Sequence, residues 1–302
     1  MYIENLAPIV IFTYNRLWHT KQTIEALQKN DLAEESELYI FSDGPKNKDS
    51  SNEVNDVREY IKKIDGFKKI TIIERDKNWG LARSIIDGVS TVVNEHGKLI
   101  VLEDDLITSP HFLYFMNKNL SLYSNSERVG SISGYVPYIE NLPDLFFLKF
   151  SSSLGWATWK RVWNSIEFNS EKLLLSFDNK KKIREFNMDG AYNYYKMLRF
   201  QNDKKIDSWA IRFLASQFLQ EFIHLRPGKS LIQHIGSDSG THCNTNTRSK
   251  EEDGIILYVP IKDENFKISI ALDIESYELY KNFFKKNIIT RIRNKLNRIL
   301  KG

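Results

Sequence analysis

Residues 99–105 read Leu-Ile-Val-Leu-Glu-Asp-Asp, an apolar run that ends in three acidic residues. A short continuous apolar run is typical of a strand that is buried on both faces of a sheet. The carboxylates of Glu103, Asp104 and Asp105 repel one another, and a hard divalent cation offsets that cost by taking oxygen ligands. Such a cation can also neutralise a diphosphate. The alternative interpretation is an acidic turn, or a cap for a helix that begins near His111.

Three apolar runs of the same kind precede this one, and segments with helical periodicity separate them. The predicted strands are Pro8–Phe12, Leu38–Phe41, Ile70–Ile73 and Leu99–Leu102, and the predicted helices are Trp18–Leu27, Asn52–Ile64 and Leu81–Val93. This alternation predicts an α/β fold with a parallel sheet and right-handed crossovers. In such a sheet, ligands bind at the carboxyl ends of the strands.

Polar side chains that can bind a nucleotide follow these strands. Thr13 and Arg16 come after the first strand, Asp43 ends the second, and Arg83 opens the third predicted helix. Either arginine can pair with phosphate oxygens, although a surface position is the alternative for each. Asp43 lies in a Ser-Asp-Gly-Pro turn, where its carboxylate can accept from a nucleobase N–H or a ribose hydroxyl. The alternative for Asp43 is an Asx-turn.

The second half of the chain carries candidates for acid–base chemistry and for metal binding. Asp207 precedes a strongly apolar predicted helix, residues 209–222, and is either a helix cap or a general base aimed at an acceptor hydroxyl. His234 and His242 flank a loop rich in glycine and serine, and one of them is a candidate additional metal ligand. The alternative for a lone histidine is a structural role.

Composition and charge indicate in which compartment the protein works and which partners it has. The chain has 302 residues, a net charge of +4 and a single cysteine, Cys243. One cysteine excludes an internal disulfide and fits a reducing compartment, and so mild a charge gives no reason to expect a nucleic-acid partner. The first residues do not resemble a signal peptide, and no apolar run approaches the roughly 20 residues that span a bilayer. We expect a cytoplasmic protein, soluble or peripheral on the cytosolic face of the inner membrane.

The end of the chain differs from the rest in charge. Residues 279–302 contain no acidic residue, and apolar and basic side chains recur there at helical spacing. This pattern predicts a basic amphipathic helix, which either adsorbs to an anionic membrane surface or packs on the domain. The predicted organisation is therefore one catalytic domain over residues 1–278, with halves of about 1–106 and 107–278, and a tail.

Taken in order, several of these segments resemble a known family. The segments PIVIFTYNR, SDG, RDKNWGLARSI and VLEDDL resemble the nucleotide-sugar-binding half of GT-A-fold glycosyltransferases, whose sheet is Rossmann-like and flanked by helices. The later segments SSSLGWATW, KKIDSWAIRF and RPGKSLIQHIGSDSGTH resemble the acceptor half of the N-acetylglucosaminyltransferase I type. The resemblance covers roughly residues 8–242.

The resemblance implies a role for each matching position. It implies an inverting transfer from a nucleotide sugar, with uracil as the base and Mn²⁺ or Mg²⁺ as the cofactor. On the donor side, it implies that Asp105 binds the metal ion, with His242 as a candidate further ligand, and that Glu103 and Asp104 contact the donor sugar and ribose. Thr13, Arg16 and Arg83 would contact the nucleotide sugar, and Asp43 would contact the base. Asp207 would be the catalytic base, and Trp156 would lie in the acceptor-side segment. The chain departs from the family in the acids before Trp209, and we expect it to have no N-terminal anchor or stem.

The predicted function is transfer of a sugar to a glycan or lipid-linked acceptor, in the synthesis of a bacterial surface polysaccharide. Two other functions remain open. A nucleotidyltransferase that makes nucleotide sugars usually carries a glycine-rich loop after the first strand, and residues 13–18 contain no glycine. A non-enzymatic glycan-binding or membrane-active protein with this fold need not keep three mutually repelling carboxylates.

Overall fold

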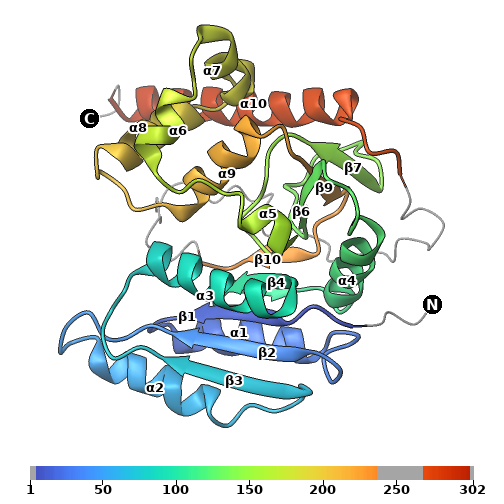
Figure 1. Ribbon diagram of the computed structural model, residues 1–302. Helices are drawn as coiled ribbons and strands as arrows, with labels where there is room; N and C mark the ends of the chain where they lie inside the picture. Colours follow the sequence, from blue (N-terminus) through green and yellow to red (C-terminus); the bar gives the residue numbers. More distant parts are fainter. Residues whose placement is uncertain (1–4, 237–267, 300–302) are drawn as a thin grey trace.

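The computed structural model describes residues 5–236 and 268–299, with the side chains of the last helix described up to residue 286. Figure 1 shows a central sheet with helices packed on both of its faces. The first half alternates strands and helices as predicted. Its elements are β1 (Ile9–Thr13), α1 (Leu17–Gln28), β2 (Glu37–Ser42), α2 (Ser51–Ile61), β3 (Lys69–Glu74), α3 (Leu81–His96), β4 (Lys98–Glu103) and β5 (Leu106–Thr108).

The second half adds short strands and a group of helices. Its elements are α4 (Phe112–Leu122), β6 (Val129–Ser133), β7 (Leu145–Leu148), β8 (Trp156–Trp159), α5 (Lys160–Trp163), α6 (Ser170–Leu175), α7 (Lys180–Phe186), the short 3-10 helix η1 (Met188–Gly190), α8 (Tyr194–Asn202), α9 (Trp209–Leu219), β9 (Ile223–Pro227), β10 (Ile232–His234) and α10 (Ile274–Ile299). The predicted apolar helix after Asp207 is confirmed as α9.

Within the described residues, the central sheet has eight strands in the order β3-β2-β1-β4-β8-β6-β9-β7. β1 pairs in parallel with β2 and β4, and β2 pairs in parallel with β3, which confirms the parallel sheet predicted for these strands. The rest of the sheet is mixed, because β8 runs antiparallel to β4 and β6, and β7 runs antiparallel to β9. The four-residue strands β7 and β8 are too short to show a clear period in the sequence.

Strand direction gathers the polar loops at one edge of the sheet. β6 runs in the same direction as β4, because β8 is antiparallel to both, and β9 is parallel to β6. The carboxyl ends of β1, β2, β3, β4, β6 and β9 therefore meet at the same edge, which we call the carboxyl edge. Thr13, Asp43 and Glu103 lie there, as ligand-binding residues do in open α/β sheets.

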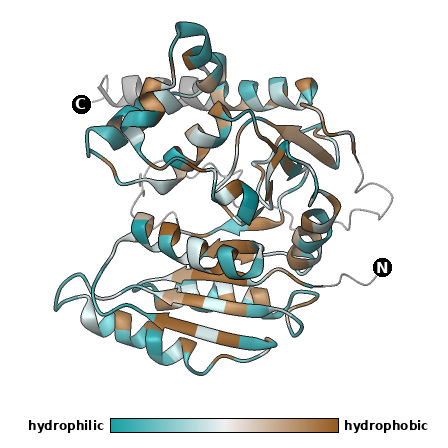
Figure 2. Cartoon of the chain, in the orientation of Figure 1, coloured by the Kyte–Doolittle hydropathy of each residue, from teal (hydrophilic) through white to brown (hydrophobic). Residues whose placement is uncertain are grey.

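Helices cover the two faces of the sheet through alternating strand residues. On β1, Ile9 and Ile11 pack in a core with α1, α2 and α4, whereas Val10 and Phe12 pack in a second core with α3 and the start of α9. A strand period of two gives this division. Figure 2 shows the central strands as hydrophobic along most of their length, as expected when both faces are covered.

A third core joins α6, α7, α8 and α9 to the beginning of α10. Tyr280 of α10 is buried, and its hydroxyl accepts a hydrogen bond from Arg226 Nη1 at 3.0 Å. α10 begins at Ile274, so the boundary predicted after residue 278 falls inside this helix. The first turns of α10 pack on the domain through Tyr277, Tyr280 and Phe284, and both interpretations of the tail stay predictions.

The side chains from residue 287 onward lie outside the described residues, and so does His242. Within residues 5–236 and 268–299, no helix combines the length and the apolar character that a bilayer crossing needs.

Candidate functional site

The acidic residues at the end of β4 converge on one arginine. Arg16 lies in the loop between β1 and α1, and its Nη2 contacts Asp104 Oδ1 and lies 2.8 Å from Asp105 Oδ2. Asp104 and Asp105 are both buried, which strengthens these charge-assisted contacts. Because a single nitrogen contacts both carboxylates, positive charge already occupies the position between them.

A histidine from β10 lies on the same carboxylate. His234 Nε2 is 3.4 Å from Asp105 Oδ2, because β10 pairs with β5 and places His234 opposite Leu106. The next residues hold this arrangement, since Ile235 N donates to the Asp105 carbonyl oxygen at 2.9 Å. A Cβ at Gly236 would lie 2.0 Å from Asp105 Oδ2, so the close approach requires glycine. His234 thus lies beside Asp105, whereas the other candidate histidine, His242, lies outside the described residues.

Burial and nearby charges separate the pKa values of the three acids. Burial, together with the charges of Asp105 and Asp104, raises the pKa of Glu103 to about 8. Burial raises the pKa of Asp104 to about 6, although Arg16 opposes that shift. Burial acts in the same direction on Asp105, but the hydrogen bonds and charges of His234 and Arg16 outweigh it and lower its pKa to about 2. Asp105 is therefore fully ionised at neutral pH and Asp104 mostly so, and a carboxylate must be ionised to bind a metal ion.

The side chains around Arg16 fit a divalent cation in their chemistry. Asp104 and Asp105 offer oxygen ligands of the kind that Mn²⁺ and Mg²⁺ prefer, and His234 offers a ring nitrogen. Among the described residues, no three or more His, Cys, Asp and Glu side chains are already grouped as a metal site. The two carboxylates do converge on a positive charge, so a cation fits there once Arg16 moves away.

Asp43 ties two loops of the carboxyl edge together. Its Oδ1 accepts from Gly44 N at 2.9 Å and Trp79 N at 2.8 Å, and its Oδ2 accepts from Gly80 N at 2.9 Å. A Cβ at Gly44 would lie 2.5 Å from the backbone of Lys77, so the turn after β2 packs directly against the loop before α3. Both oxygens of Asp43 serve this loop contact, and its contact with a nucleobase stays a prediction.

An aromatic residue that the sequence analysis did not single out organises the start of α3. The Cζ atoms of Arg75 and Arg83 each lie 3.9 Å from the centre of the Trp79 ring. Arg75 also pairs with Asp87 of α3. The tripeptide Asn-Trp-Gly just before a predicted helix, with an arginine in the first turn, is the sequence signal that could have identified Trp79.

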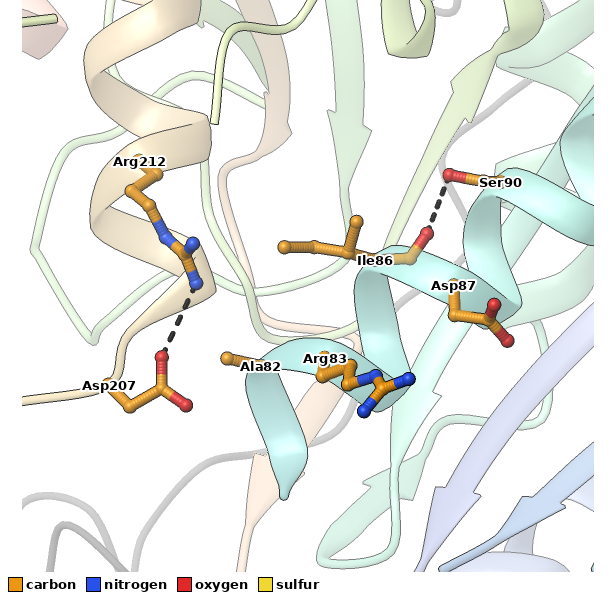
Figure 3. Close-up of a pocket in the computed structure, with 7 residues that line it drawn as sticks. All are labelled: Ala82, Arg83, Ile86, Asp87, Ser90, Asp207 and Arg212. Atoms are coloured by element: carbon orange, nitrogen blue, oxygen red, sulfur yellow. Dashed lines mark hydrogen bonds and ion pairs between the residues drawn. The ribbon is translucent and has the colours of Figure 1, made fainter. Parts of the chain in front are cut away.

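A cavity of about 540 Å³ lies between α3 and the first turn of α9 (Figure 3). The residues that line it are Ala82, Arg83, Ile86, Asp87, Ser90, Asp207 and Arg212. The cavity brings two predicted site residues together, Arg83 and Asp207, whereas no member of the acidic triplet lines it. Asp207 is mostly exposed, and its Oδ1 lies 3.4 Å from Arg212 Nη2. Ser208 is the N-cap of α9, because its side chain accepts from Ile211 N, so Asp207 is not that cap.

Trp156 lies in the core beneath the carboxyl edge. Its side chain is fully buried and stacks on Trp163 at 5.9 Å and on Trp209 at 5.5 Å between ring centres. β8 is an interior strand of the sheet, and its two neighbours leave no open side for this residue. Trp156 itself is thus a core residue, and the acceptor-side role of its segment stays a prediction.

Two buried polar groups near the end of β1 have no hydrogen-bond partner among the described residues. Within the described ranges, Thr13 Oγ1 and Arg16 Nη1 are buried and accept or donate no hydrogen bond. Buried polar atoms are rarely left unpaired in folded proteins. Both belong to residues for which the sequence predicts nucleotide-sugar binding, and both lie at the carboxyl edge.

Residues 9–124 match the family model described as Glycosyl transferase family 2. The matched segment runs from β1 to the end of α4, and it contains Arg16, Asp43, Arg83 and the acidic triplet. The match over these residues supports the predicted enzyme class, glycosyltransferase. With the sheet topology, the match confirms the predicted GT-A-like fold. The closer resemblance to the N-acetylglucosaminyltransferase I type stays a prediction.

Solved structures show a distant similarity over parts of the chain. A crystal structure of S. aureus TarS is 12% identical over 42% of this chain and 21% of that chain, with a TM-score of 0.32. For TarS 1-349 the values are 9% identity, 77% and 61% coverage and a TM-score of 0.46. The mannosyltransferase PcManGT from Pyrobaculum calidifontis, in complex with GDP-Man and Mn²⁺, is 9% identical over 72% of each chain, with a TM-score of 0.40.

The chain thus spans only part of the length of the TarS chains that it resembles. No curated protein sequence matches it. The fold assignment therefore rests on the family match and on the sheet topology.

Proposed function

We propose that this chain is an inverting, metal-dependent glycosyltransferase that moves a sugar from a UDP-linked donor to a hydroxyl of a glycan or lipid-linked acceptor. The observation that carries the proposal is the convergence of Asp104 and Asp105 on one arginine nitrogen at the carboxyl edge, within the segment that matches the family model. Two buried carboxylates held on a cation form a site that a divalent metal ion can take over.

The donor side is assigned to the residues around the triplet. Asp105 would hold the metal ion with His234 beside it, and the bound ion would neutralise the donor diphosphate. Arg16 Nη1 and Thr13 Oγ1, which have no partner in the described structure, would donate to diphosphate oxygens. Glu103 and Asp104 would accept hydrogen bonds from hydroxyls of the donor sugar and the ribose.

Asp207 is assigned as the general base. Its carboxylate takes the proton of the acceptor hydroxyl while the acceptor oxygen attacks the anomeric carbon of the donor. The bond from that carbon to the diphosphate oxygen breaks in the same step, so the configuration inverts and a nucleoside diphosphate leaves. The exposure of Asp207 in the cavity of Figure 3 supports this role, and so does the presence of a different N-cap, Ser208.

Transfer and donor hydrolysis test the assignment in wild type, Asp105→Asn, Asp207→Asn and the control Asp203→Asn, an exposed acid that ends α8. We expect Asp105→Asn to lose metal-dependent hydrolysis, and Asp207→Asn to lose transfer by about 100-fold or more while still binding donor. Asp203→Asn should behave as wild type. Pyrophosphate release from a nucleoside triphosphate and a sugar phosphate would instead indicate the nucleotidyltransferase, and no turnover at all would indicate the non-enzymatic alternative.

The acceptor side is proposed to lie at a membrane surface, in the synthesis of a bacterial surface polysaccharide on the cytosolic face. The support is the absence of acidic residues after Glu278 among many basic ones. Because Tyr280 is buried in the domain, the informative truncation removes residues 287–302 and leaves the packed part of α10 in place. We expect the truncated protein to lose sedimentation with vesicles that contain anionic phospholipid. Equal binding of both proteins would contradict this part of the proposal.

A further inference from the structure

The loop between β3 and α3 is fixed from several sides. Asp43 accepts from the backbone N–H groups of Trp79 and Gly80, and Asn78 Nδ2 donates to the Gly44 carbonyl oxygen at 3.0 Å. From α2, Arg58 Nη2 donates to the Arg75 carbonyl oxygen at 2.7 Å. These contacts hold the backbone on both sides of Trp79, so the indole ring is held in a defined position.

Two guanidinium groups stack on the ring of Trp79, and they differ in whether a carboxylate pairs with them. Arg75 lies on one side, and Asp87 neutralises its charge. Arg83 lies on the other side, and in the described part of the chain no carboxylate pairs with it. A guanidinium over an indole face is attracted by the ring quadrupole, so Trp79 holds Arg83 without cancelling its charge.

The held charge lies at a place that favours anions. Arg83 is in the first turn of α3, where the helix dipole also favours negative charge. It lines the same cavity as Asp207, as Figure 3 shows. An exposed arginine normally samples many rotamers, and binding a ligand then costs side-chain entropy. Stacking on a fixed ring reduces that cost in advance.

We propose that Trp79 is a positioning residue that presents the Arg83 guanidinium to the diphosphate of the donor, with Asp43 holding the loop that carries the ring. This inference rests on the proposed function. Trp79 would affect donor binding through Arg83. Trp79 itself need not touch the donor.

Calorimetric titration of UDP in the presence of Mn²⁺ tests the proposal with wild type, Trp79→Leu, Trp79→Phe, Arg83→Met and the Leu/Met double variant. We expect Trp79→Leu to weaken UDP binding by about 3- to 10-fold, and Trp79→Phe, which keeps an aromatic face, to stay within about twofold of wild type. The double variant should bind no more weakly than Arg83→Met alone, because both changes remove the same interaction.

A matched control lies at the opposite edge of the sheet. Arg161 stacks on Trp159 at 4.7 Å, and Trp159 pairs with Lys98 at the amino end of β4. Arg161→Met removes a similar cation–π pair and should leave UDP binding unchanged. Thermal unfolding of each variant checks that the fold is intact, and Arg83→Met and Trp79→Phe serve if Trp79→Leu does not fold.

The outcomes separate this inference from the function on which it rests. If wild type binds UDP and Trp79→Leu binds it equally well, or if the two effects multiply in the double variant, the positioning role is wrong and the proposed function stands. If Trp79→Phe binds as weakly as Arg83→Met, stacking is also refuted. If wild type binds neither UDP nor pyrophosphate with Mn²⁺, the proposed donor site and this inference both fail.

Discussion

Arg16 Nη2 lies 2.8 Å from Asp105 Oδ2, and the same nitrogen contacts Asp104, so the chain itself supplies the positive charge between its two buried aspartates. Burial opposes the charged form of Arg16, but the two aspartates raise its pKa above the ordinary value. A metal ion that binds Asp105 must therefore compete with this arginine, and Arg16 is then free to turn toward the donor diphosphate.

Arg16→Gln should increase the affinity for Mn²⁺ when no nucleotide is present, by a factor on the order of ten, because the competing internal cation is gone. Without metal, the same variant should melt at a lower temperature than wild type, since two buried carboxylates lose their partner. Mn²⁺ should bring its melting temperature back to that of wild type. Free Mn²⁺ measured by electron paramagnetic resonance gives the affinity. Arg184→Gln, an exposed arginine of α7, is the control, and weaker Mn²⁺ binding by Arg16→Gln would contradict the competition.

Gly236→Ala should reduce Mn²⁺ affinity nearly as much as Asp105→Ala while changing thermal stability little. The added Cβ would lie 2.0 Å from Asp105 Oδ2, and the carboxylate, as the mobile end of a side chain, is the group that gives way. A displaced carboxylate no longer faces Arg16 and His234. The same titration with Mn²⁺ checks this, and wild-type affinity in Gly236→Ala would show that Asp105 is not the ligand.

His224 should make the folded chain sensitive to acid. Burial, with the nearby charge of Arg226, lowers its pKa to about 3, and its Nδ1 lies 2.8 Å from Ser131 Oγ. The unfolded chain binds a proton near pH 6.5 and the folded chain does not, so stability is complete above about pH 6.5 and falls toward pH 3. The loss is about 1.4 kcal/mol per pH unit within that window.

Urea unfolding at about pH 6.5 and about pH 5 measures this difference in free energy of unfolding. His224→Gln should be less stable than wild type at both values, because it disturbs a packed site, but it should lose about 1–2 kcal/mol less between them. Equal losses in the two proteins would mean that His224 is not buried in its neutral form.

Trp156→Phe should lower the free energy of unfolding by about 1–3 kcal/mol, since it leaves a gap among the rings of Trp163, Trp209 and Phe213. Donor binding should stay within about twofold of wild type in the folded variant, because Trp156 supports the loops and touches no ligand. Urea unfolding and UDP titration measure the two quantities. A raised acceptor KM with unchanged stability would instead indicate that Trp156 acts on the acceptor side.

The sequence was sufficient to predict the parallel half of the sheet. The strands of that half are apolar along their length, and strong helical patterns separate them, so local signals and the final fold agree. The same logic placed Arg16, Asp43 and the acidic triplet at one edge, because parallel strands share the direction of their carboxyl ends.

The sequence did not predict contacts that depend on pairing far along the chain. The contact of His234 with Asp105 follows from the pairing of β10 with β5, which joins residues more than 120 positions apart. The burial of Trp156 follows from the interior position of β8 in the sheet. The hydrogen bonds of Asp43 to Trp79 N and Gly80 N depend on a loop whose approach requires Gly44. Each of these outcomes is set by tertiary packing, on which local pattern has little bearing.

The most direct test of the central claim is a thermal-shift screen of nucleotide sugars, with and without Mn²⁺, on wild type and Asp105→Ala. A ligand that binds only the folded state raises the melting temperature by mass action. The account predicts that a UDP-sugar stabilises wild type only when Mn²⁺ is present and that Asp105→Ala abolishes this effect. If no nucleotide sugar shifts the wild type under any metal condition, the donor site at the carboxyl edge is contradicted.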